Sequence, residues 1–345
     1  MEPLAAKRMV KSLAADCGFV ACGVTDCEPI DPPVVQRMRR WAHSELSDEL
    51  GYLRRNEPLR ADPQMLLNEA RSVLCLALPC NFPAADLPAD HGRIARYARG
   101  REYHKQAKKR CGKLLEAVRR ELEADLVARI FVDSAPVMER SLAVRAGLGW
   151  VGRNGCLIVP GAGSFVLLAE VFWSLALPAD APTTRSCEEC YQCVRACPGE
   201  ALCGDGLLDA RRCVSWRTEK PGDVPEQFRP AMGASLWGCD ICQQVCPHNQ
   251  AAPVFDEQLL GPDPIADLPL EQVLGWEADD WDRFTRGRAL RAAPLEVLQR
   301  NAAIAAGNVG SRDLLGPLAE LARRRPELAG IVDWAARRIT SAPIR

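Results

Sequence analysis

The stretch CEECYQCVRACPGEAL, residues 187–202, places four cysteines in the spacing C-x2-C-x2-C-x3-C and follows the last one with a proline. In iron–sulfur proteins a run of this spacing binds one [4Fe–4S] cluster through its first three thiolates, and its fourth thiolate ligates another cluster. A second stretch, GCDICQQVCPHN at 238–249, has the shorter spacing C-x2-C-x3-C, again before a proline. The two stretches together predict a segment that holds two [4Fe–4S] clusters.

The number of ligands favours crossed binding between the two stretches. We expect the first cluster to be bound by Cys187, Cys190, Cys193 and Cys246. We expect the second to be bound by Cys197, Cys239, Cys242 and one further cysteine. Cys213, in LLDARRCVSW between the stretches, is the expected fourth ligand, and Cys203 is the alternative.

Structural zinc and disulfides are the competing explanations of these cysteines. Zinc sites commonly use two C-x2-C pairs, but the doubled x2-x2-x3-Pro spacing is more specific for clusters. Disulfides are rare in cytosolic proteins, and the amino-terminal sequence MEPLAAKRMVKSLAADCG is typical of an amphipathic helix rather than of a secretory signal. The remaining cysteines are expected to be buried thiols, namely Cys17, Cys22, Cys27, Cys75, Cys80, Cys111 and Cys156.

Composition limits the other possibilities. The chain has 345 residues, 48% hydrophobic and 26% charged, which is enough for two or three packed units. Its formal net charge of -1 excludes a global attraction to polyanions, so any basic surface has to be local. The apolar run 157–177 is interrupted by a proline, two glycines and a glutamate, whereas a membrane span needs about 20 unbroken apolar residues. We therefore expect a cytoplasmic protein that does not enter a membrane.

The order of patterns along the chain predicts three units. Residues 1–180 have the pattern of an α/β domain, with helices at 3–16 and 106–124. Its strands are expected at 18–26, at 71–79, within 124–136 up to Asp133, and at 164–175. Residues 181–258 form the cysteine-rich unit, which the clusters rather than an apolar core should hold together. After a Pro/Asp-rich link at 261–268, the tail of the third unit, 259–345, reads as helix pairs of the HEAT type.

Several segments outside the cysteine stretches carry a resemblance to a known family. They are GRIARYARGREYHK at 92–105, VDSAPVMERSLAVRAGLGWVGRNGCLI at 132–158, GSFVLLAEV at 163–171 and RNAAIAAGN at 300–308. Together with the cysteine stretches and in this order, they resemble the epoxyqueuosine reductases over nearly the whole chain.

The resemblance implies a fold and an activity. The fold is an α/β (α+β) cobalamin-binding domain related to nitroreductase-like folds, then a ferredoxin-like domain with two [4Fe–4S] clusters, then a HEAT-like helical cap. The activity is removal of the epoxide oxygen of epoxyqueuosine at the wobble position of tRNA. The resemblance also implies cobalamin as the cofactor, the clusters as its electron supply, and Asp133 as the proton donor.

Asp133 also has a bottom-up rationale. It follows the apolar strand ARIFV, and desolvation at a strand end can raise the pKa of a carboxyl so that it acts as an acid. The alternative is that Asp133 caps a helix beginning in DSAPVMER. Glu139 and Arg140 are candidates to orient the acid or the substrate, and a surface pair is their alternative. Contacts to the cofactor are expected from Arg55, Tyr97, Asp133, Arg140 and Ser215.

No histidine stands in the D-x-H-x-x-G pattern through which other corrinoid proteins ligate cobalt. The family resemblance therefore implies cobalamin without a histidine ligand. Structural roles are expected for His104 and His248.

A local basic stretch is the candidate tRNA contact. Nine Lys or Arg residues stand between Arg93 and Lys113 against the single acid Glu102, with tyrosines interleaved. Such a stripe suits the phosphates of an anticodon stem-loop. A solvated helix face, or arginines that grip the cofactor, would give the same pattern. Arg323 to Arg325 form a second basic group on the helical cap, for which solubility is the alternative to a contact with tRNA.

One segment departs from the family pattern. In VSWRTEKPGD, 214–223, Ser215 keeps its place, but Arg217 and Lys220 alter the local charge. This leaves open a corrinoid iron–sulfur reductase for a small molecule, and a non-catalytic electron-transfer protein. For the main interpretation we expect a monomer that receives electrons from a low-potential donor the sequence does not identify.

Overall fold

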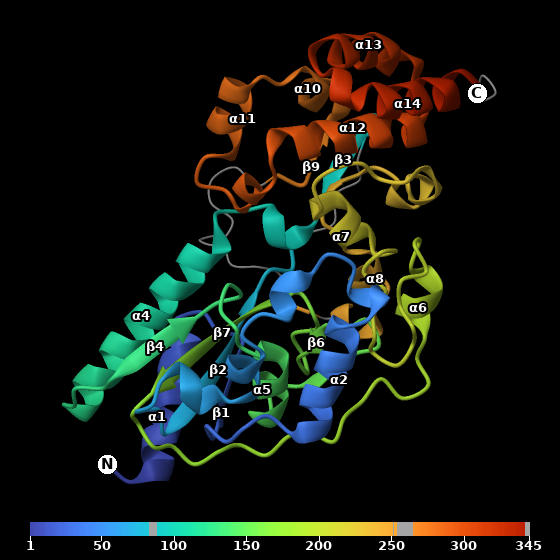
Figure 1. Ribbon diagram of the computed structural model, residues 1–345. Coiled ribbons are helices and arrows are strands. Elements are labelled where there is room, and N and C mark those ends of the chain that lie inside the picture. The colour runs from blue at the N-terminus through green and yellow to red at the C-terminus, as the bar shows by residue number, and fades with distance from the viewer. Residues whose placement is uncertain (83–87, 251, 254–264, 342–345) are drawn as a thin grey trace.

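The computed structural model describes residues 1–82, 88–250, 252–253 and 265–341, and its central element is an antiparallel sheet (Figure 1). The strands run in the order β1-β2-β7-β4, with the bounds Ala21–Thr25, Ser72–Pro79, Val166–Trp173 and Ala128–Phe131. Every residue of β2 is buried. This explains why its sequence SVLCLALP is apolar throughout instead of alternating, since both faces of the sheet are covered.

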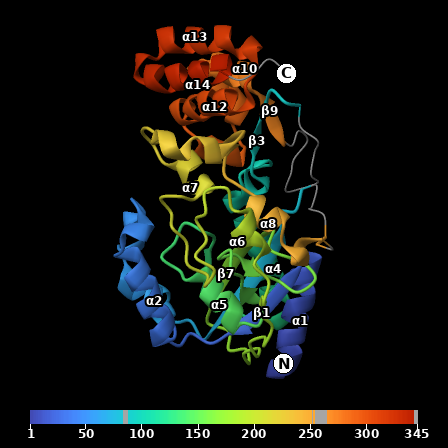
Figure 2. The ribbon, with the colours of Figure 1, turned by 90° about the vertical axis from the view of Figure 1, so that its right-hand side faces the viewer.

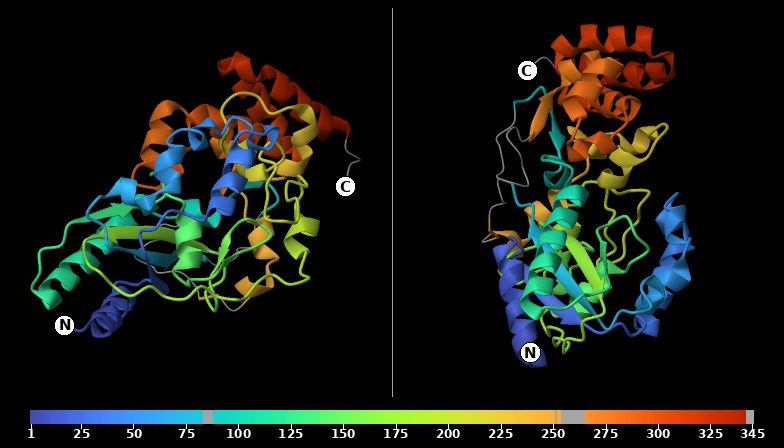
Figure 3. Two further views of the ribbon diagram at one scale, coloured as in Figure 1. Left: turned by 60° about the horizontal axis from the view of Figure 1, so that its bottom comes forward. Right: turned by 90° about the vertical axis from the view of Figure 1, so that its left-hand side faces the viewer.

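Helices cover the two faces of this sheet, and α1 and α2 lie on opposite sides of it (Figures 2 and 3). On one face α1 and α4 pack together over Leu74 and Val171. On the other, α2 and α5 pack over Val73 and Phe172. These helices have the bounds Pro3–Asp16 (α1), Pro32–Ala42 (α2), Tyr103–Leu122 (α4) and Glu139–Arg145 (α5).

The cysteine-rich segment forms short helices beside this sheet (Figure 1). Its helices are α6 (Gln192–Ala196), α7 (Val214–Glu219) and α8 (Ile241–Gln244). α6 and α8 pack against each other. A small hairpin of β5 (Trp150–Val151) and β6 (Leu157–Ile158) adjoins them, since Trp150 and Ile158 contact Cys246.

A second sheet joins three distant parts of the chain in the order β8-β3-β9. Its strands are β3 (His91–Ile94), β8 (Ser235–Trp237) and β9 (Asp267–Pro269), with β3 parallel to β8 and antiparallel to β9. The other helices are α3 (Glu57–Ala61), α10 (Leu270–Gly275), α11 (Ala278–Thr285), α12 (Leu295–Val309), α13 (Leu315–Arg324) and α14 (Ala329–Ser341).

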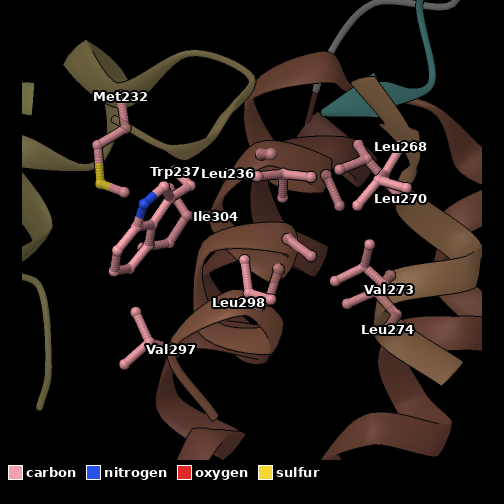
Figure 4. Packing of buried hydrophobic residues seen from close by; sticks show 14 of the residues in the cluster. Met232, Leu236, Trp237, Leu268, Leu270, Val273, Leu274, Val297, Leu298 and Ile304 are labelled. Carbon is pink, nitrogen blue, oxygen red and sulfur yellow. The ribbon is translucent and has the colours of Figure 1, made fainter. Parts of the chain in front are cut away.

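Two apolar clusters lie wholly within residues 1–180, around the central sheet, and a third cluster joins parts of all three units expected from the sequence. Ile94, Leu236 and Trp237 belong to the same buried cluster as Leu298 and Ile304 of α12, as Figure 4 shows for most of them. The expected boundaries 1–180, 181–258 and 259–345 stay a prediction, and the third cluster crosses them. The junction at 258/259 and the start of the 261–268 link lie outside the described residues.

Two polar residues of α12 fix the end of α7. The buried Arg300 donates hydrogen bonds of 2.5 to 2.8 Å to the carbonyl oxygens of Arg217, Lys220 and Gly222. Asn301 donates to the carbonyl oxygen of Thr218 at 2.9 Å. Buried polar groups are stable only when hydrogen-bonded. These hydrogen bonds therefore explain why the segment RNAAIAAGN begins with two polar residues at buried positions.

Most predicted elements are confirmed, with shifted ends. The helix at 3–16 is α1, and the helix expected at 106–124 is α4, which starts three residues earlier. Residues 164–175 form the single strand β7. β4 ends at Phe131 rather than at Asp133. No helix within the described ranges is long and apolar enough to cross a membrane.

Candidate active site

A pocket of about 320 Å³ opens between the central sheet and the cysteine-rich segment. One wall is apolar and consists of residues 165–168 at the start of β7. Gln243 and Cys156 line the pocket on the side of the cysteine-rich segment. Its charged and phenolic lining groups are Tyr97, Tyr103, Asp133, Glu139, Arg140 and Asp240.

Asp133 has three polar partners at this pocket. Tyr103 donates its hydroxyl to Asp133 Oδ2 at 2.6 Å, and His104 Nε2 lies 3.3 Å from the same oxygen. The backbone N–H of Asp133 donates to Glu139 Oε1 at 2.6 Å. Its φ of 56° is left-handed, which is uncommon for a residue other than glycine. The loop is thus held in an unusual backbone conformation by contacts at both ends of one residue.

The electrostatics of Asp133 differ from the sequence-based expectation. The hydrogen bond with His104 lowers the pKa of Asp133, burial raises it, and the bond from Tyr103 lowers it again, so that the net shift is downward. The expected rise was wrong because only desolvation, and not the two donors, could be foreseen. The capping alternative is also wrong, since the residue at the N-cap of α5 is Met138. Asp133 is therefore a carboxylate at rest.

His104 belongs to the site instead of having a purely structural role. Its ring stacks on Tyr103 at 4.0 Å between centroids. The contact with Asp133 raises the pKa of His104, burial opposes this, and Glu102 raises the pKa further. His104 consequently holds a proton more tightly than an ordinary histidine and keeps it next to the Asp133 carboxylate.

A second polar group lies behind Tyr97. The hydroxyl groups of Tyr97 and Ser215 both donate to Glu219 Oε1 at 2.9 Å. Burial raises the pKa of Glu219, and the two donors oppose that rise. Sequence reasoning missed Glu219, because its contacts with Tyr97 and Ser215 arise only in the fold.

Of the other expected cofactor contacts, Arg140 lines the pocket, and Arg55 is not among the described residues that do. Arg140 lines the pocket and donates to the carbonyl oxygen of Gly155. Arg55 is exposed and is absent from the described residues that line the pocket. Tyr52, not foreseen, lies near the acid: burial raises its pKa and the charge of Asp133 adds to the rise.

The unusual charges of VSWRTEKPGD do not face the pocket. Arg217 is buried, donates to the carbonyl oxygen of Arg211 and stacks on Phe228. Lys220 pairs with Asp48 at 3.1 Å. The altered charges are thus neutralised by local partners.

The thiols gather in two groups. A small cavity is lined by Cys187, Cys190, Cys193 and Cys246. In the other group, burial and then the charges of neighbouring thiolates raise the pKa of Cys242; these neighbours are Cys156, Cys239, Cys213 and Cys197. Cys203 is exposed, and its pKa is raised by burial and by Asp205 and Asp209, with no thiol among the causes. Among the described residues, no group of three or more Cys, His, Asp or Glu is arranged to hold a metal ion.

Only part of the basic stretch faces outward. Arg96 and Arg99 are buried, and Arg110 donates to the carbonyl oxygen of Cys17. Six of the nine side chains are exposed, namely Arg93, Arg101, Lys105, Lys108, Lys109 and Lys113. The four lysines lie on α4, whose first turn supplies Tyr103 and His104 to the site. The exposed charge therefore begins at the pocket.

The second basic group is neutralised. Arg323 pairs with Glu320, Arg324 with Glu277, and Arg325 with Glu327. These pairs agree with a surface that only needs to be soluble.

Two family models match this chain. One described as "Epoxyqueuosine reductase QueG, DUF1730" matches residues 60–134, and one described as "4Fe-4S double cluster binding domain" matches 186–249. A curated epoxyqueuosine reductase from Xanthomonas campestris pv. campestris is 36% identical over 352 aligned positions, and the match covers 97% of this chain and 96% of the relative.

Solved structures agree over almost the whole length. The crystal structure of an epoxyqueuosine reductase with a tRNA-Tyr epoxyqueuosine-modified stem loop matches with a TM-score of 0.86 and 27% identity, covering 98% of this chain and 91% of that one. The Bacillus subtilis epoxyqueuosine reductase, solved with its catalytic aspartate loop swung out of the active site, matches with a TM-score of 0.86 at 25% identity and the same coverage.

Proposed function

The chain belongs to the epoxyqueuosine reductase family, and we propose that it reduces epoxyqueuosine to queuosine at the wobble position of tRNA. The single observation that carries this is Asp133, bonded to Tyr103 and His104 in an open pocket beside two groups of thiols, one of four cysteines and one in which Cys156 joins the four expected ligands. Removal of the epoxide oxygen to leave a double bond takes up two electrons and two protons and releases water. The site therefore has to deliver both electrons and protons.

The two thiol groups are the proposed cluster ligands. We assign one [4Fe–4S] cluster to Cys187, Cys190, Cys193 and Cys246, and the other to Cys197, Cys213, Cys239 and Cys242. The family model for a double cluster spans all eight of these cysteines. Cys213 rather than Cys203 completes the second set, since its thiol interacts with that of Cys197. The electrons come from a donor outside this chain.

The pocket suits cobalamin. Its apolar wall at 165–168 can pack against a flat macrocycle, and its open mouth leaves room for a group larger than the pocket itself. Tyr97 and Arg140 are the lining residues we expect to hold it, while Ser215 acts through Glu219. Arg55 would reach it only from outside the pocket. When bound there, cobalamin supplies a low-potential cobalt centre for electron transfer to the epoxide.

The chain itself supplies the proton. Asp133 is a carboxylate at rest, so it has to receive a proton before it can give one to the epoxide oxygen. Tyr103 and His104 are its immediate donors, and His104 has the raised pKa of a group that keeps a proton near neutral pH. We propose that His104 loads Asp133 and that Asp133 protonates the leaving oxygen.

The tRNA would approach over α4. The exposed lysines of this helix, Lys105, Lys108 and Lys109, extend from the first turn that carries Tyr103. We name these three the α4 lysines. A relative was solved with an epoxyqueuosine-modified stem loop, and cations next to the pocket suit its phosphates.

Finer properties follow from this assignment. A tRNA substrate implies that the protein works in the cytoplasm, and we expect a monomer. We further infer that the sheet domain is related to nitroreductase-like folds and that the helices from α10 to α14 are HEAT-like.

The test uses a cell that lacks epoxyqueuosine reduction and carries this gene, with cobalamin supplied. Mass spectrometry of tRNA nucleosides should show queuosine replacing epoxyqueuosine. If epoxyqueuosine persists although the purified protein retains both clusters, the substrate assignment is wrong.

A further inference from the structure

A carboxyl group is buried in the central sheet behind the active site. Glu170 lies in the middle of β7, opposite Cys75 of β2 and Phe131 of β4. Its side chain is fully buried, with 0% exposed, on the face that also buries Phe172. An ionised carboxylate without partners is very unfavourable in such a place. Glu170 therefore needs either a donor or a proton.

No donor among the described residues supplies that need. Neither oxygen of Glu170 has an N–H or O–H partner. The group it meets is the carboxyl of Glu139, from the first turn of α5. Two carboxylates cannot hydrogen-bond to each other, but a carboxylic acid and a carboxylate can. The contact between Glu139 and Glu170 is therefore a hydrogen bond only while one proton lies between them.

The surrounding charges favour this proton. Burial raises the pKa of Glu170 well above its ordinary value, and the charge of Glu139 adds to the rise. Burial followed by the charge of Asp133 raises the pKa of Glu139 to about 7. The other titratable or charged groups that interact with the pair are Arg60, Arg140, Tyr103, Cys75 and Cys111.

The other end of Glu139 reaches the catalytic loop. Its Oε1 accepts the backbone N–H of Asp133 at 2.6 Å, at the residue with the left-handed φ of 56°. A chain of contacts thus runs from the rigid sheet through Glu170 and Glu139 to the backbone of Asp133. The carboxylate of Asp133 is in turn fixed by Tyr103.

We propose that Glu139 and Glu170 are a positioning pair that shares one proton and, through it, holds the backbone of Asp133 in place for the reaction. The inference rests on the proposed function of the site. Loss of the shared proton leaves two negative carboxylates in an apolar environment. They repel, Glu139 is no longer fixed to the sheet, and the loop of Asp133 is released.

The first experiment needs no activity. Hydrogen exchange is measured on peptides covering 132–138 in the cluster-loaded protein without tRNA, from pH 6 to 8.5, and is corrected for the intrinsic pH dependence of exchange. The pKa of about 7 belongs to Glu139, which accepts the hydrogen bond, whereas Glu170 keeps its proton to higher pH. The protection of this loop in the wild type should therefore fall above pH 7, by up to about tenfold per pH unit, as Glu170 loses its proton. The measurement is continued to pH 10 to cover this range.

Two matched variants keep the shape of the side chain and replace the shared proton by an amide donor that does not titrate. In Glu170→Gln the amide donates to the Glu139 carboxylate at every pH, and in Glu139→Gln the amide donates to Glu170 while its oxygen still accepts from Asp133. Either variant should keep the loop protected over the whole pH range. Glu116→Gln, on the exposed face of α4, should behave as the wild type. Protection in the wild type that does not change with pH, or a Gln variant that loses protection as the wild type does, overturns the proposal.

Turnover of the modified stem loop provides the second measurement. Glu170→Gln should move the alkaline decline of kcat up by at least about one pH unit, with KM unchanged. Glu170→Met, which cannot bond to Glu139, should lower kcat at all pH values without restoring it at low pH. An alkaline decline that is unchanged in Glu170→Gln argues against the pair. If even the wild type does not convert the stem loop, the proposed function fails, and the exchange data still decide whether the pair holds the loop.

Discussion

Replacement of Asp133 by asparagine tests the chemistry of the site most directly. The amide oxygen of asparagine can still accept the hydroxyl of Tyr103, which is 2.6 Å away in the wild type, so the loop should keep its place. Asparagine also tolerates a φ of 56°. What is lost is the proton that the acid delivers. General acid catalysis contributes about 10²- to 10⁴-fold, which corresponds to about 2.7 to 5.4 kcal/mol of transition-state stabilisation at 1.36 kcal/mol per decade.

The assay is a single-turnover reaction on an epoxyqueuosine-modified stem loop, with the protein cluster-loaded and supplied with cobalamin and a strong reductant. We expect kcat for Asp133→Asn to fall by this factor while the iron content stays that of the wild type. Asp125→Asn, an exposed aspartate before β4, is the matched control and should react normally. A rate for Asp133→Asn within about threefold of the wild type between pH 6 and 8 would refute the role of Asp133 as the acid.

Further predictions concern the clusters, the tRNA and the pH dependence of stability. Cys213→Ser should reduce the iron content from about eight to about four per chain, whereas Cys203→Ser should leave it unchanged in the same analysis. Replacing the α4 lysines with alanine should flatten the slope of log binding constant against log salt by about 2, measured with the stem loop, since each lost phosphate contact removes about 0.7 to 0.9 from the slope. A folded-state pKa of about 7 for Glu139, above its ordinary 4.5, means that the folded protein keeps a proton that the unfolded chain has lost. The free energy of unfolding should therefore fall as pH rises from about 4.5 through 7, and denaturant titrations of Glu139→Gln should show a smaller fall.

The fold was predictable where the local pattern is strong. Continuous apolar runs gave β2 and β7, and helical spacing gave α1 and α4. The boundaries of the three expected units stay a prediction. The cluster that crosses them was not predictable, because Ile94 and Trp237 meet α12 only through long-range packing that no local pattern records.

The site was predictable for residues with a motif and not for those that act through neighbours. The cysteine spacing identified both thiol groups, and the family segment identified Asp133. Glu170 looked like an interruption in an apolar run, and its role depends on Glu139 approaching from another element. The downward pKa shift of Asp133 depends on His104, which lies 29 residues earlier in the chain.

The hydrogen bonds from Arg300 and Asn301 to the end of α7 also bear on biosynthesis, because the donors are synthesised later than the acceptors. α7 follows directly after Cys213, and its last carbonyl oxygens are fixed by a side chain that leaves the ribosome 83 residues after Arg217. All eight expected cluster ligands have been synthesised once Cys246 has left the ribosome, whereas the contacts that hold the end of α7 form only after α12 has followed. The helix directly after Cys213 therefore gains its buried hydrogen-bond partners last.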